Sequence, residues 1–321
     1  MSSTLPPRPL YSTYVNKINV WWGDAVANEI GATDSRGYNI VNLAFWTPNA
    51  DGSSNPVDIA LLWANVENYF DLSTSQFGST PDEIRKNLRE EYHKQGTRVL
   101  ISAFGATSFP TTQGVPATPC GENLAKFIID NQLDGVDLDY EDNVAMENGT
   151  AVPWLVEMTE AMLKKFAATD QTYIILHAPQ APYFMDGKYP KNYVALHETK
   201  LSDGSTMGDH IDGYLVQFYN QDSTEYSTYQ TLFETSDGWS TGSSVKQIAD
   251  KGIPIEKISV GKPVTVNDVA NTGYVPPDQL AAIFSTAREP GKPWGVADKV
   301  GGVMGWQFIS DPDGAWIAQM K

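Results

Sequence analysis

The amino-acid sequence predicts an α/β fold, a single (β/α)8 barrel built from parallel strands and the helices that connect them. Short apolar runs such as Ile40–Trp46 recur along the chain, and they are typical of strands that helices cover on both faces. Segments with helical spacing alternate with these runs, and 321 residues are enough for eight such units. A doubly wound open sheet is disfavoured because no glycine-rich G-x-G-x-x-G turn follows Trp22.

Eight segments are expected to form the barrel strands. In chain order they are Lys17–Trp22, Asn39–Trp46, Thr97–Phe104, Asp134–Asp139, Thr172–His177, Ile211–Tyr219, Lys257–Gly261 and Gly301–Phe308. Amphipathic helices are expected between them at Pro81–Lys94, Gly121–Asn131, Val152–Ala168 and Pro277–Glu289. The first of these helices has acidic residues in its first turn and Lys94 in its last turn, an arrangement that complements the helix dipole.

Charge and composition exclude several functional classes. The chain carries 22 basic and 39 acidic side chains and a net charge of −17, which disfavours nucleic acid as a partner. No window reaches the run of about 18 apolar residues that a membrane span requires, so no membrane association is expected. Cys120 is the single cysteine in the sequence, so neither an intrachain disulfide nor a multi-cysteine metal site is expected.

One domain is expected over residues 1–321, with the barrel at about residues 17–308, because no linker-like stretch or repeat interrupts the sequence. The N-terminal segment contains Pro6, Pro7 and Pro9 and no continuous apolar core, so it does not resemble a secretory signal peptide. The compartment stays open between the cytoplasm, export without a signal peptide, and the mature form of a secreted protein. A monomer is expected.

The segment Asp134-Gly-Val-Asp-Leu-Asp-Tyr-Glu141 is the most informative part of the sequence. Side chains of a strand alternate between its two faces, so Asp137, Asp139 and Glu141 should share one face. In a barrel this face points inward, and Glu141 reaches the carboxyl end of the strands, where such barrels carry their active sites. Carboxylates in file are costly to bury unless protons or hydrogen bonds are shared, so the row predicts a functional site.

Two simpler interpretations of this segment compete with a functional one. A solvated acidic loop would not need the apolar residues that alternate with the acids. A calcium-binding loop starting at Asp137 would need glycine where Asp142 stands and a final glutamate where Asn148 stands.

The acidic segment resembles the D-G-x-D-x-D-x-E signature of glycoside hydrolase family 18, the family of chitinases and endo-β-N-acetylglucosaminidases. Further segments are similar to strand motifs of its plant- and fungal-type, hevamine-like branch. In chain order they are Val20–Gly23, Val41–Phe45, Val99–Gly105, Ala178–Gln180, Val216–Asn220 and Gly301–Trp306. In one departure, Phe104 occupies the first glycine position of the third-strand motif S-x-G-G, where a bulky ring is expected to narrow or reshape the floor of the cleft.

The resemblance implies a mechanism in which the 2-acetamido group of the substrate is the nucleophile. Glu141 would protonate the leaving oxygen and later activate water, Asp139 would hold the acetamido N–H, and Asp137 would share a proton with Asp139. Tyr219 would donate its hydroxyl to the acetamido oxygen, and Trp306 would form the floor under the sugar ring. Further substrate contacts are expected from Gln180, Gln217, Asn220, Trp21, Phe45 and Phe104. No metal or other cofactor is implied.

The resemblance implies an endo-acting, retaining chitinase that hydrolyses β-1,4 bonds in chitin or N-acetylglucosamine oligomers. An endo-β-N-acetylglucosaminidase acting on the chitobiose core of N-glycans, a non-catalytic chitin-binding lectin and a glycosidase inhibitor of the same fold remain alternatives. Retention of Glu141 argues against the lectin, because silent members usually lose this acid. About forty residues separate the last two expected strands, so no large inserted domain and an open groove are expected. No separate carbohydrate-binding module is expected.

Overall fold

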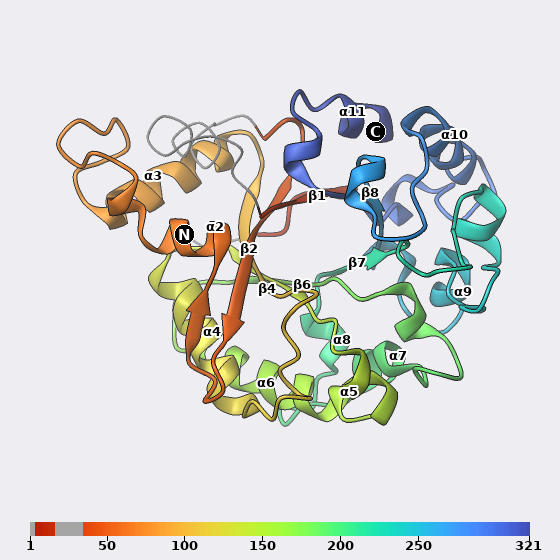
Figure 1. The fold of residues 1–321 in the computed structure, drawn as a ribbon, viewed down its shortest axis with the longest axis horizontal. Helices are drawn as coiled ribbons and strands as arrows, with labels where there is room; N and C mark the ends of the chain where they lie inside the picture. Colours follow the sequence, from red (N-terminus) through yellow and green to blue (C-terminus); the bar gives the residue numbers. More distant parts are fainter. Residues whose placement is uncertain (1–3, 17–34) are drawn as a thin grey trace.

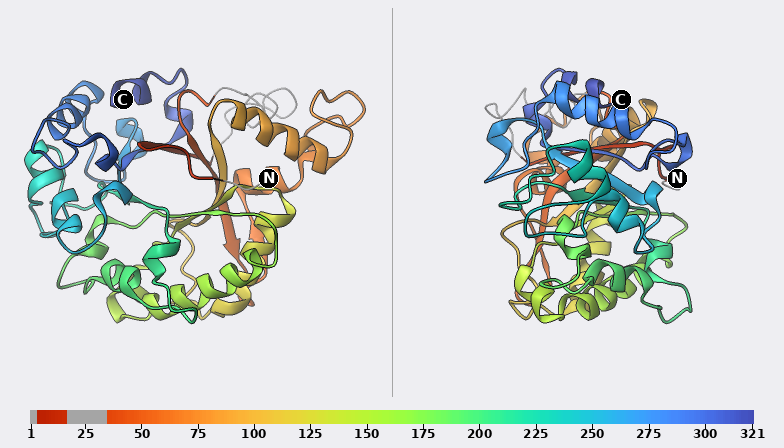
Figure 2. Two further views of the ribbon diagram at one scale, coloured as in Figure 1. Left: turned by 180° about the vertical axis from the view of Figure 1, so that it is seen from behind. Right: turned by 90° about the vertical axis from the view of Figure 1, so that its right-hand side faces the viewer.

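The computed structural model describes residues 4–16 and 35–321, and its centre is a closed barrel of parallel strands. Within these residues the barrel strands are β1 (Leu10–Val15), β2 (Ile40–Pro48), β4 (Arg98–Phe104), β5 (Gly135–Asp139), β6 (Ile174–His177), β7 (Gly213–Gln217), β8 (Ile258–Pro263) and β9 (Gly302–Trp306). β1 pairs with both β2 and β9, which closes the ring, and the short β3 (Ser54–Pro56) is added antiparallel to β2. Helices surround the strands in Figure 1 and Figure 2. The predicted (β/α)8 barrel is confirmed.

The helices of the outer layer vary widely in length. They are α2 (Asp58–Ala64), α3 (Pro81–Lys94), α4 (Ala117–Asp130), α5 (Asn143–Asn148), α6 (Ala151–Phe166), α7 (Asn192–Glu198), α8 (Met207–His210), α9 (Val245–Ala249), α10 (Pro277–Ala287) and α11 (Ala315–Met320). The bounds of α3 are those predicted, whereas α4 begins earlier than predicted. Gly121 of α4 allows close packing on α6, because a Cβ atom there would lie 2.0 Å from the Met158 carbonyl oxygen.

The first barrel strand differs from the prediction. Its position is occupied by Leu10–Val15, and the predicted segment Lys17–Trp22 lies outside the described residues. The middle of β1 carries two buried polar residues: the Thr13 hydroxyl donates to the Gly305 carbonyl (2.9 Å), and Ser12 Oγ accepts from the Asn42 amide (2.9 Å). Apolar periodicity does not detect a strand whose buried positions are satisfied by hydrogen bonds.

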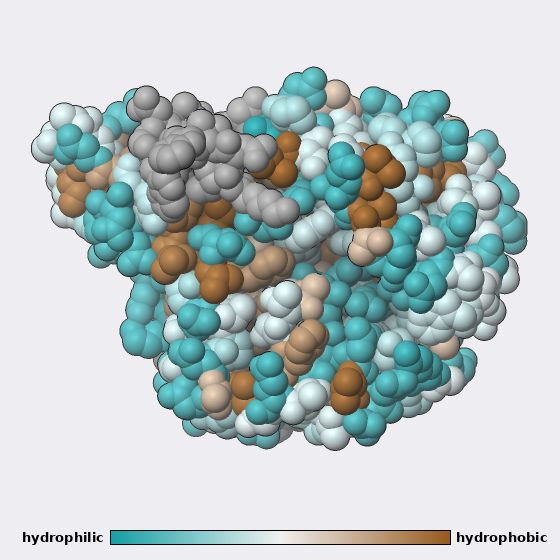
Figure 3. All heavy atoms as spheres, in the orientation of Figure 1, coloured by the Kyte–Doolittle hydropathy of each residue, from teal (hydrophilic) through white to brown (hydrophobic). Residues whose placement is uncertain are grey.

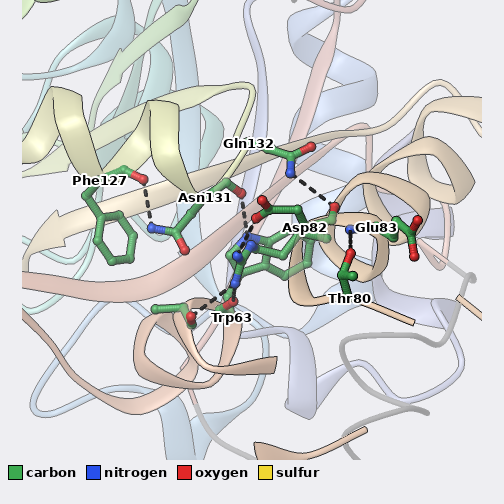
Figure 4. Close-up of polar contacts among 9 residues, drawn as sticks. Trp63, Thr80, Asp82, Glu83, Phe127, Asn131 and Gln132 are labelled. Carbon is green, nitrogen blue, oxygen red and sulfur yellow. Dashed lines mark hydrogen bonds and ion pairs between the residues drawn. The ribbon is translucent and has the colours of Figure 1, made fainter. Parts of the chain in front are cut away.

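Hydrogen bonds join the helices beside β2 and β4, as Figure 4 shows. The Thr80 hydroxyl caps α3 by accepting a backbone N–H of its first turn at 3.3 Å. The indole N–H of Trp63 in α2 donates to the Asn131 carbonyl that follows α4, at 3.0 Å. Gln132 Nε2 donates to the carbonyl of Asp82 in α3, also at 3.0 Å. The contacts made by Trp63 and Gln132 join α2 and α3 to the end of α4.

Alternation along β5 places its acids inside the barrel, as the sequence predicts. Val136 and Leu138 belong to the outer apolar core between the strands and the helices. A smaller inner cluster contains Tyr14 of β1, whose hydroxyl donates to Asp137 Oδ2 at 2.9 Å. Since β1 and β5 are not adjacent strands, this hydrogen bond crosses the interior of the barrel.

The connection between β8 and β9 is short. It contains α10 and two single-turn segments, Val266–Asp268 and Ala297–Lys299. The expectation of no large inserted domain is therefore confirmed. Among the helices of the described residues, none has the length and apolar character needed to cross a membrane.

Gly135, the glycine of the acidic signature, starts β5 where two backbones come close together. A Cβ atom at this position would lie 2.0 Å from the carbonyl oxygen of Ile174 in β6. Gly213, at the start of β7, is different, because a Cβ atom there would meet nothing nearer than 3.4 Å. The close approach of β5 to β6 therefore explains why a residue without a side chain stands at this position of the signature.

We expect Gly135→Ala to lower the free energy of unfolding by at least about 2 kcal/mol, because β5 and β6 must separate to admit the methyl group. Gly213→Ala is the matched control and should change the free energy of unfolding by less than about 1 kcal/mol. Urea unfolding of both purified variants measures the difference. Equal losses would contradict the role assigned to the close contact with β6.

Candidate active site

Three carboxyl groups form a row at the carboxyl end of β5. Asp137 and Asp139 lie in the strand and are buried, and Glu141 follows the strand and is partly buried. Each accepts hydrogen bonds from a different set of side chains. The three groups therefore occupy three distinct environments.

Asp137 is the innermost acid and is fully buried. Its Oδ2 accepts hydrogen bonds from the hydroxyls of Tyr14 (2.9 Å) and Ser102 (2.8 Å), while its Oδ1 has no partner among the described residues. Burial raises the pKa of Asp137 to about 7, and the two hydroxyl donors act in the opposite direction. Asp137 is therefore poised to carry a proton near neutral pH, and Oδ1 is free to hold it.

Asp139 lies between the other two acids. Its Oδ1 accepts from Gln217 Nε2 (2.9 Å), and the same amide donates to the Ala178 carbonyl (3.0 Å). Burial raises the pKa of Asp139 well above its usual value, the charges of Glu141 and Asp137 raise it further, and the bond from Gln217 lowers it. Like charges at this spacing oppose one another, so the row favours states that retain a proton.

Glu141 is the outermost acid. Its Oε2 accepts from Gln180 Nε2 at 2.8 Å, and Gln180 Oε1 accepts in turn from Gln221 at 3.3 Å. Burial raises the pKa of Glu141, while hydrogen bonds from Gln180 and Gln217 lower it. A carboxyl group whose pKa is raised keeps its proton closer to neutral pH, as a general acid requires.

A cavity of about 310 Å³ lies beside the two outer acids. Its lining combines carboxyl and amide groups with aromatic rings, and includes Asp139, Glu141, Gln217, Tyr14, Phe45, Tyr219 and Trp306. Figure 3 shows a largely hydrophilic surface with several separate apolar patches. Such a mixture of polar groups and rings suits a ligand that has both hydroxyl groups and an apolar ring face.

Aromatic rings from three strands meet at this cavity. The centroid of the Trp306 ring lies 5.5 Å from that of Tyr14 and 6.4 Å from that of Phe45. Tyr219 also borders the cavity, and burial together with the neighbouring acids raises the pKa of its hydroxyl well above the usual value. The Tyr219 hydroxyl therefore stays protonated and can donate a hydrogen bond. The structure brings the predicted aromatic residues Phe45, Tyr219 and Trp306 together with the two outer acids.

Phe104 borders the cavity, but its ring packs in the outer core. Its ring packs edge-on against Trp46 (6.3 Å), Tyr140 (5.9 Å) and Trp154 (5.9 Å) in the outer core. The backbone explains this, because Phe104 has φ +82°, in the left-handed region that favours glycine. This backbone conformation turns the ring out of the alternation of β4, although Phe104 is among the residues that border the cavity.

Asn220 borders the cavity, but its side-chain oxygen is used within the protein. Oδ1 accepts the backbone N–H groups of Ala270 (2.8 Å) and Asn271 (3.3 Å), in the loop after β8. Asn220 has φ +59°, a conformation that asparagine tolerates better than most residues. The structure therefore gives Asn220 a role in ordering this loop, and its contact with substrate stays a prediction.

Two residues of the site were missed by sequence analysis. Tyr14 and Ser102 hold Asp137, and the signal that would have found Ser102 is register, because it pairs with Asp137 across β4 and β5. Tyr14 belongs to the strand that apolar periodicity did not detect. The predicted contact Trp21 lies outside the described residues. Within the described ranges, no group of three or more histidine, cysteine or acidic side chains is arranged to hold a metal ion.

Comparison with known proteins gives a family and a set of related folds. The family model described as glycosyl hydrolases family 18 matches residues 86–311. A GH18 chitinase from Pseudoalteromonas aurantia is 26% identical, over 97% of this chain and 98% of its own, with a TM-score of 0.69. A GH18 chitinase from Chromobacterium violaceum (17% identity, 97% and 82%, TM-score 0.64) and a xylanase-alpha-amylase inhibitor protein (15%, 98% and 98%, 0.57) have the same fold.

We expect the thermal stability to fall as pH rises from about 4 to about 7, because folding raises the pKa of Asp137 from 3.8 to about 7. The folded state holds a proton that the unfolded chain releases, so this stabilisation is complete below pH 3.8 and is lost as pH rises through about 7.

Calorimetry of the wild type and of Asp137→Asn across this pH range measures the effect. The amide cannot titrate, so the melting temperature of the variant should depend less on pH. Parallel curves for the two proteins would contradict proton retention at Asp137.

Proposed function

The chain belongs to glycoside hydrolase family 18, and from that premise we propose that it is an endo-acting, retaining chitinase. It would cleave β-1,4 bonds between N-acetylglucosamine units. The observation that carries the proposal is the row of acids whose outer members, Asp139 and Glu141, border a cavity with aromatic walls. The 26% identity with a chitinase over nearly the whole chain supports this substrate class. The narrower membership of the plant- and fungal-type, hevamine-like branch stays a prediction.

In the proposed mechanism the substrate supplies its own nucleophile. Glu141 gives its proton to the leaving glycosidic oxygen while the 2-acetamido oxygen attacks the anomeric carbon, and an oxazolinium ion forms. Asp139 accepts a hydrogen bond from the acetamido N–H and stabilises the positive charge of this ion. Glu141, now ionised, takes a proton from water, which opens the ring from the same face as the leaving group and gives net retention.

Asp137 has a supporting part in this mechanism. Asp139 needs its negative charge most when the oxazolinium ion forms, and a proton shared with Asp137 keeps the row from carrying three charges before that point. Hydrogen bonds from Tyr14 and Ser102 to one oxygen leave Asp137 Oδ1 available for that shared proton, which supports the proposal.

Tyr219 and Trp306 are proposed to position the reacting sugar. Tyr219 would donate its hydroxyl to the acetamido oxygen and align it with the anomeric carbon. Trp306 would support the apolar face of the ring, and its partial exposure beside the cavity supports this. Gln180, Gln217 and Phe45 remain proposed substrate contacts. Gln180 and Gln217 already donate to Glu141 and Asp139, so they would also orient these acids before substrate arrives.

The alternative functions differ from that of a chitinase either in their substrate or in having no catalytic activity. An endo-β-N-acetylglucosaminidase would use the same acids on the chitobiose core of N-glycans, and it stays the second candidate. One protein of the same fold, 15% identical to this chain, is an inhibitor protein, so the barrel alone does not imply catalytic activity. The complete row of acids favours an enzyme over an inhibitor or a chitin-binding lectin.

We expect the purified protein to hydrolyse N-acetylglucosamine oligomers and to leave a high-mannose glycoprotein intact when both are assayed side by side. Glu141→Gln should lower kcat by at least about a thousandfold, because the amide keeps the shape of the side chain but has no proton to deliver. Binding of an oligomer to this variant, measured by calorimetry, should stay within about threefold of the wild type. Release of glycans without cleavage of chitin oligomers would favour the second candidate.

We expect internal cleavage of long chains because the short β8–β9 connection leaves no inserted domain to wall one side of the groove. The viscosity of a soluble chitin derivative should therefore fall early, before much reducing sugar accumulates. Viscometry and a reducing-end assay on the same reaction measure both quantities. Release of disaccharide from the outset at nearly constant viscosity would contradict an open groove.

A further inference from the structure

Lys262, near the end of β8, is a fully buried lysine that donates to backbone carbonyls. Its Nζ donates to the carbonyls of Phe218 (2.7 Å), Tyr226 (2.9 Å) and Gly273 (3.0 Å). The carbonyl of Glu225 lies farther away, at 3.4 Å, and the three N–H donors of an ammonium group match the three nearer carbonyls. We call Lys262 and its three partners the carbonyl clamp.

Burial of an amine in the carbonyl clamp costs more free energy of desolvation than burial of a methionine side chain of similar length would. Burial lowers the pKa of Lys262 to about 7, and the carboxylate of Glu225 acts in the opposite direction with a smaller effect. An apolar side chain of similar length would avoid this desolvation but would leave the three carbonyls without their donor. The cost of the buried amine indicates a purpose other than packing.

The carbonyl clamp joins three separate segments at the mouth of the barrel. Phe218 directly follows β7, Tyr226 lies farther along the loop after β7, and Gly273 lies in the loop after β8. Phe218 is also the residue immediately before Tyr219, the proposed partner of the acetamido oxygen. The clamp therefore acts on the backbone next to a proposed catalytic side chain.

The loop after β8 lies directly on the backbone of Tyr219. Gly273 has φ +102°, and a Cβ atom there would be 2.5 Å from the Tyr219 Cα and 2.7 Å from its Cβ. Asn220, the residue after Tyr219, donates its backbone N–H to the Thr272 carbonyl at 2.7 Å. Lys262 thus holds the carbonyl of Phe218, which directly precedes Tyr219 in the chain, and that of Gly273, which packs on the backbone of Tyr219.

Lys262 does not itself border the cavity. Alternation along β8 puts it on the same face as Ile258 and Val260, which belong to the outer core, as does its partner Tyr226. Any effect of Lys262 on the reaction must therefore pass through another residue.

We propose that Lys262 is a positioning residue that holds the Tyr219 hydroxyl at the acetamido oxygen by joining the loop after β7, which carries Tyr219, to the loop after β8. This inference rests on the role of Tyr219 under the proposed function. Positioning of this kind affects the step in which the acetamido group attacks, so it should appear in kcat more than in KM.

The test compares Lys262→Met with a matched control, Lys257→Met. Lys257 directly precedes β8, and its Nζ donates to the carbonyls of Gly208 (2.7 Å) and Ile211 (2.6 Å) at the opposite end of the barrel. Both variants should lower the melting temperature. Lys262→Met should also lower kcat on chitin oligomers by at least about tenfold with KM within about twofold, while Lys257→Met keeps both constants. An unchanged kcat in folded Lys262→Met would overturn the proposal.

A double-mutant cycle with Tyr219→Phe shows whether the effect passes through the tyrosine. We expect Lys262→Met to lower kcat in the wild-type background and to have little further effect beside Tyr219→Phe. The same loss in both backgrounds would overturn the proposal but leave the role of Tyr219 intact. An unchanged kcat in Tyr219→Phe alone would show instead that the proposed function of Tyr219 is wrong, and the inference about Lys262 would fall with it.

If Lys262→Met yields no folded protein, Gly273→Ala applies the same test from the other side of the contact. The added methyl group must displace the backbone of Tyr219 or the loop itself. We expect kcat to fall by at least about tenfold, again with little further loss beside Tyr219→Phe. A folded Gly273→Ala protein with wild-type kcat would overturn the positioning of Tyr219 by this loop.

Discussion

Electrostatic repulsion within a row of buried carboxyl groups is the constraint on which the rest of this structure depends. Asp137, Asp139 and Glu141 are held together by the period-two geometry of one strand, in a region where ionised groups are costly. Hydroxyl donors come from β1 and β4 and amide donors from β7 and the residues after β6. Only a closed barrel brings donors from four strands to one point, so the fold is the means by which this row is tolerated.

The same donors make three similar groups chemically different. Asp137 receives two hydroxyl groups on one oxygen, Asp139 receives an amide and lies between two other acids, and Glu141 receives an amide beside the cavity. A division of labour among acids needs environments that separate their affinities for a proton. Here that separation comes from which strand faces each carboxyl group.

Much of this arrangement could be predicted from the sequence, and the exceptions have physical causes. The inward acids on β5 and the bounds of α3 were predicted correctly because alternation and helix-terminal charge are local signals. β1 was missed because its interior is polar. The packing of the Phe104 ring in the outer core follows a backbone with φ +82°, which no pattern in the sequence indicates. The loop contacts of Asn220 depend on residues about fifty positions away, which no local pattern encodes.

The pairing of β1 with β9 has a consequence for the synthesis of this chain on the ribosome. Leu10 and Gly302 are partners in register, so nearly the whole chain must be synthesised before the ring can close. Until β9 is made, the edge of β1 that faces it has no partner strand. A β1 strand paired only with β2 therefore keeps an exposed edge, a template for pairing with other chains, until β9 covers it.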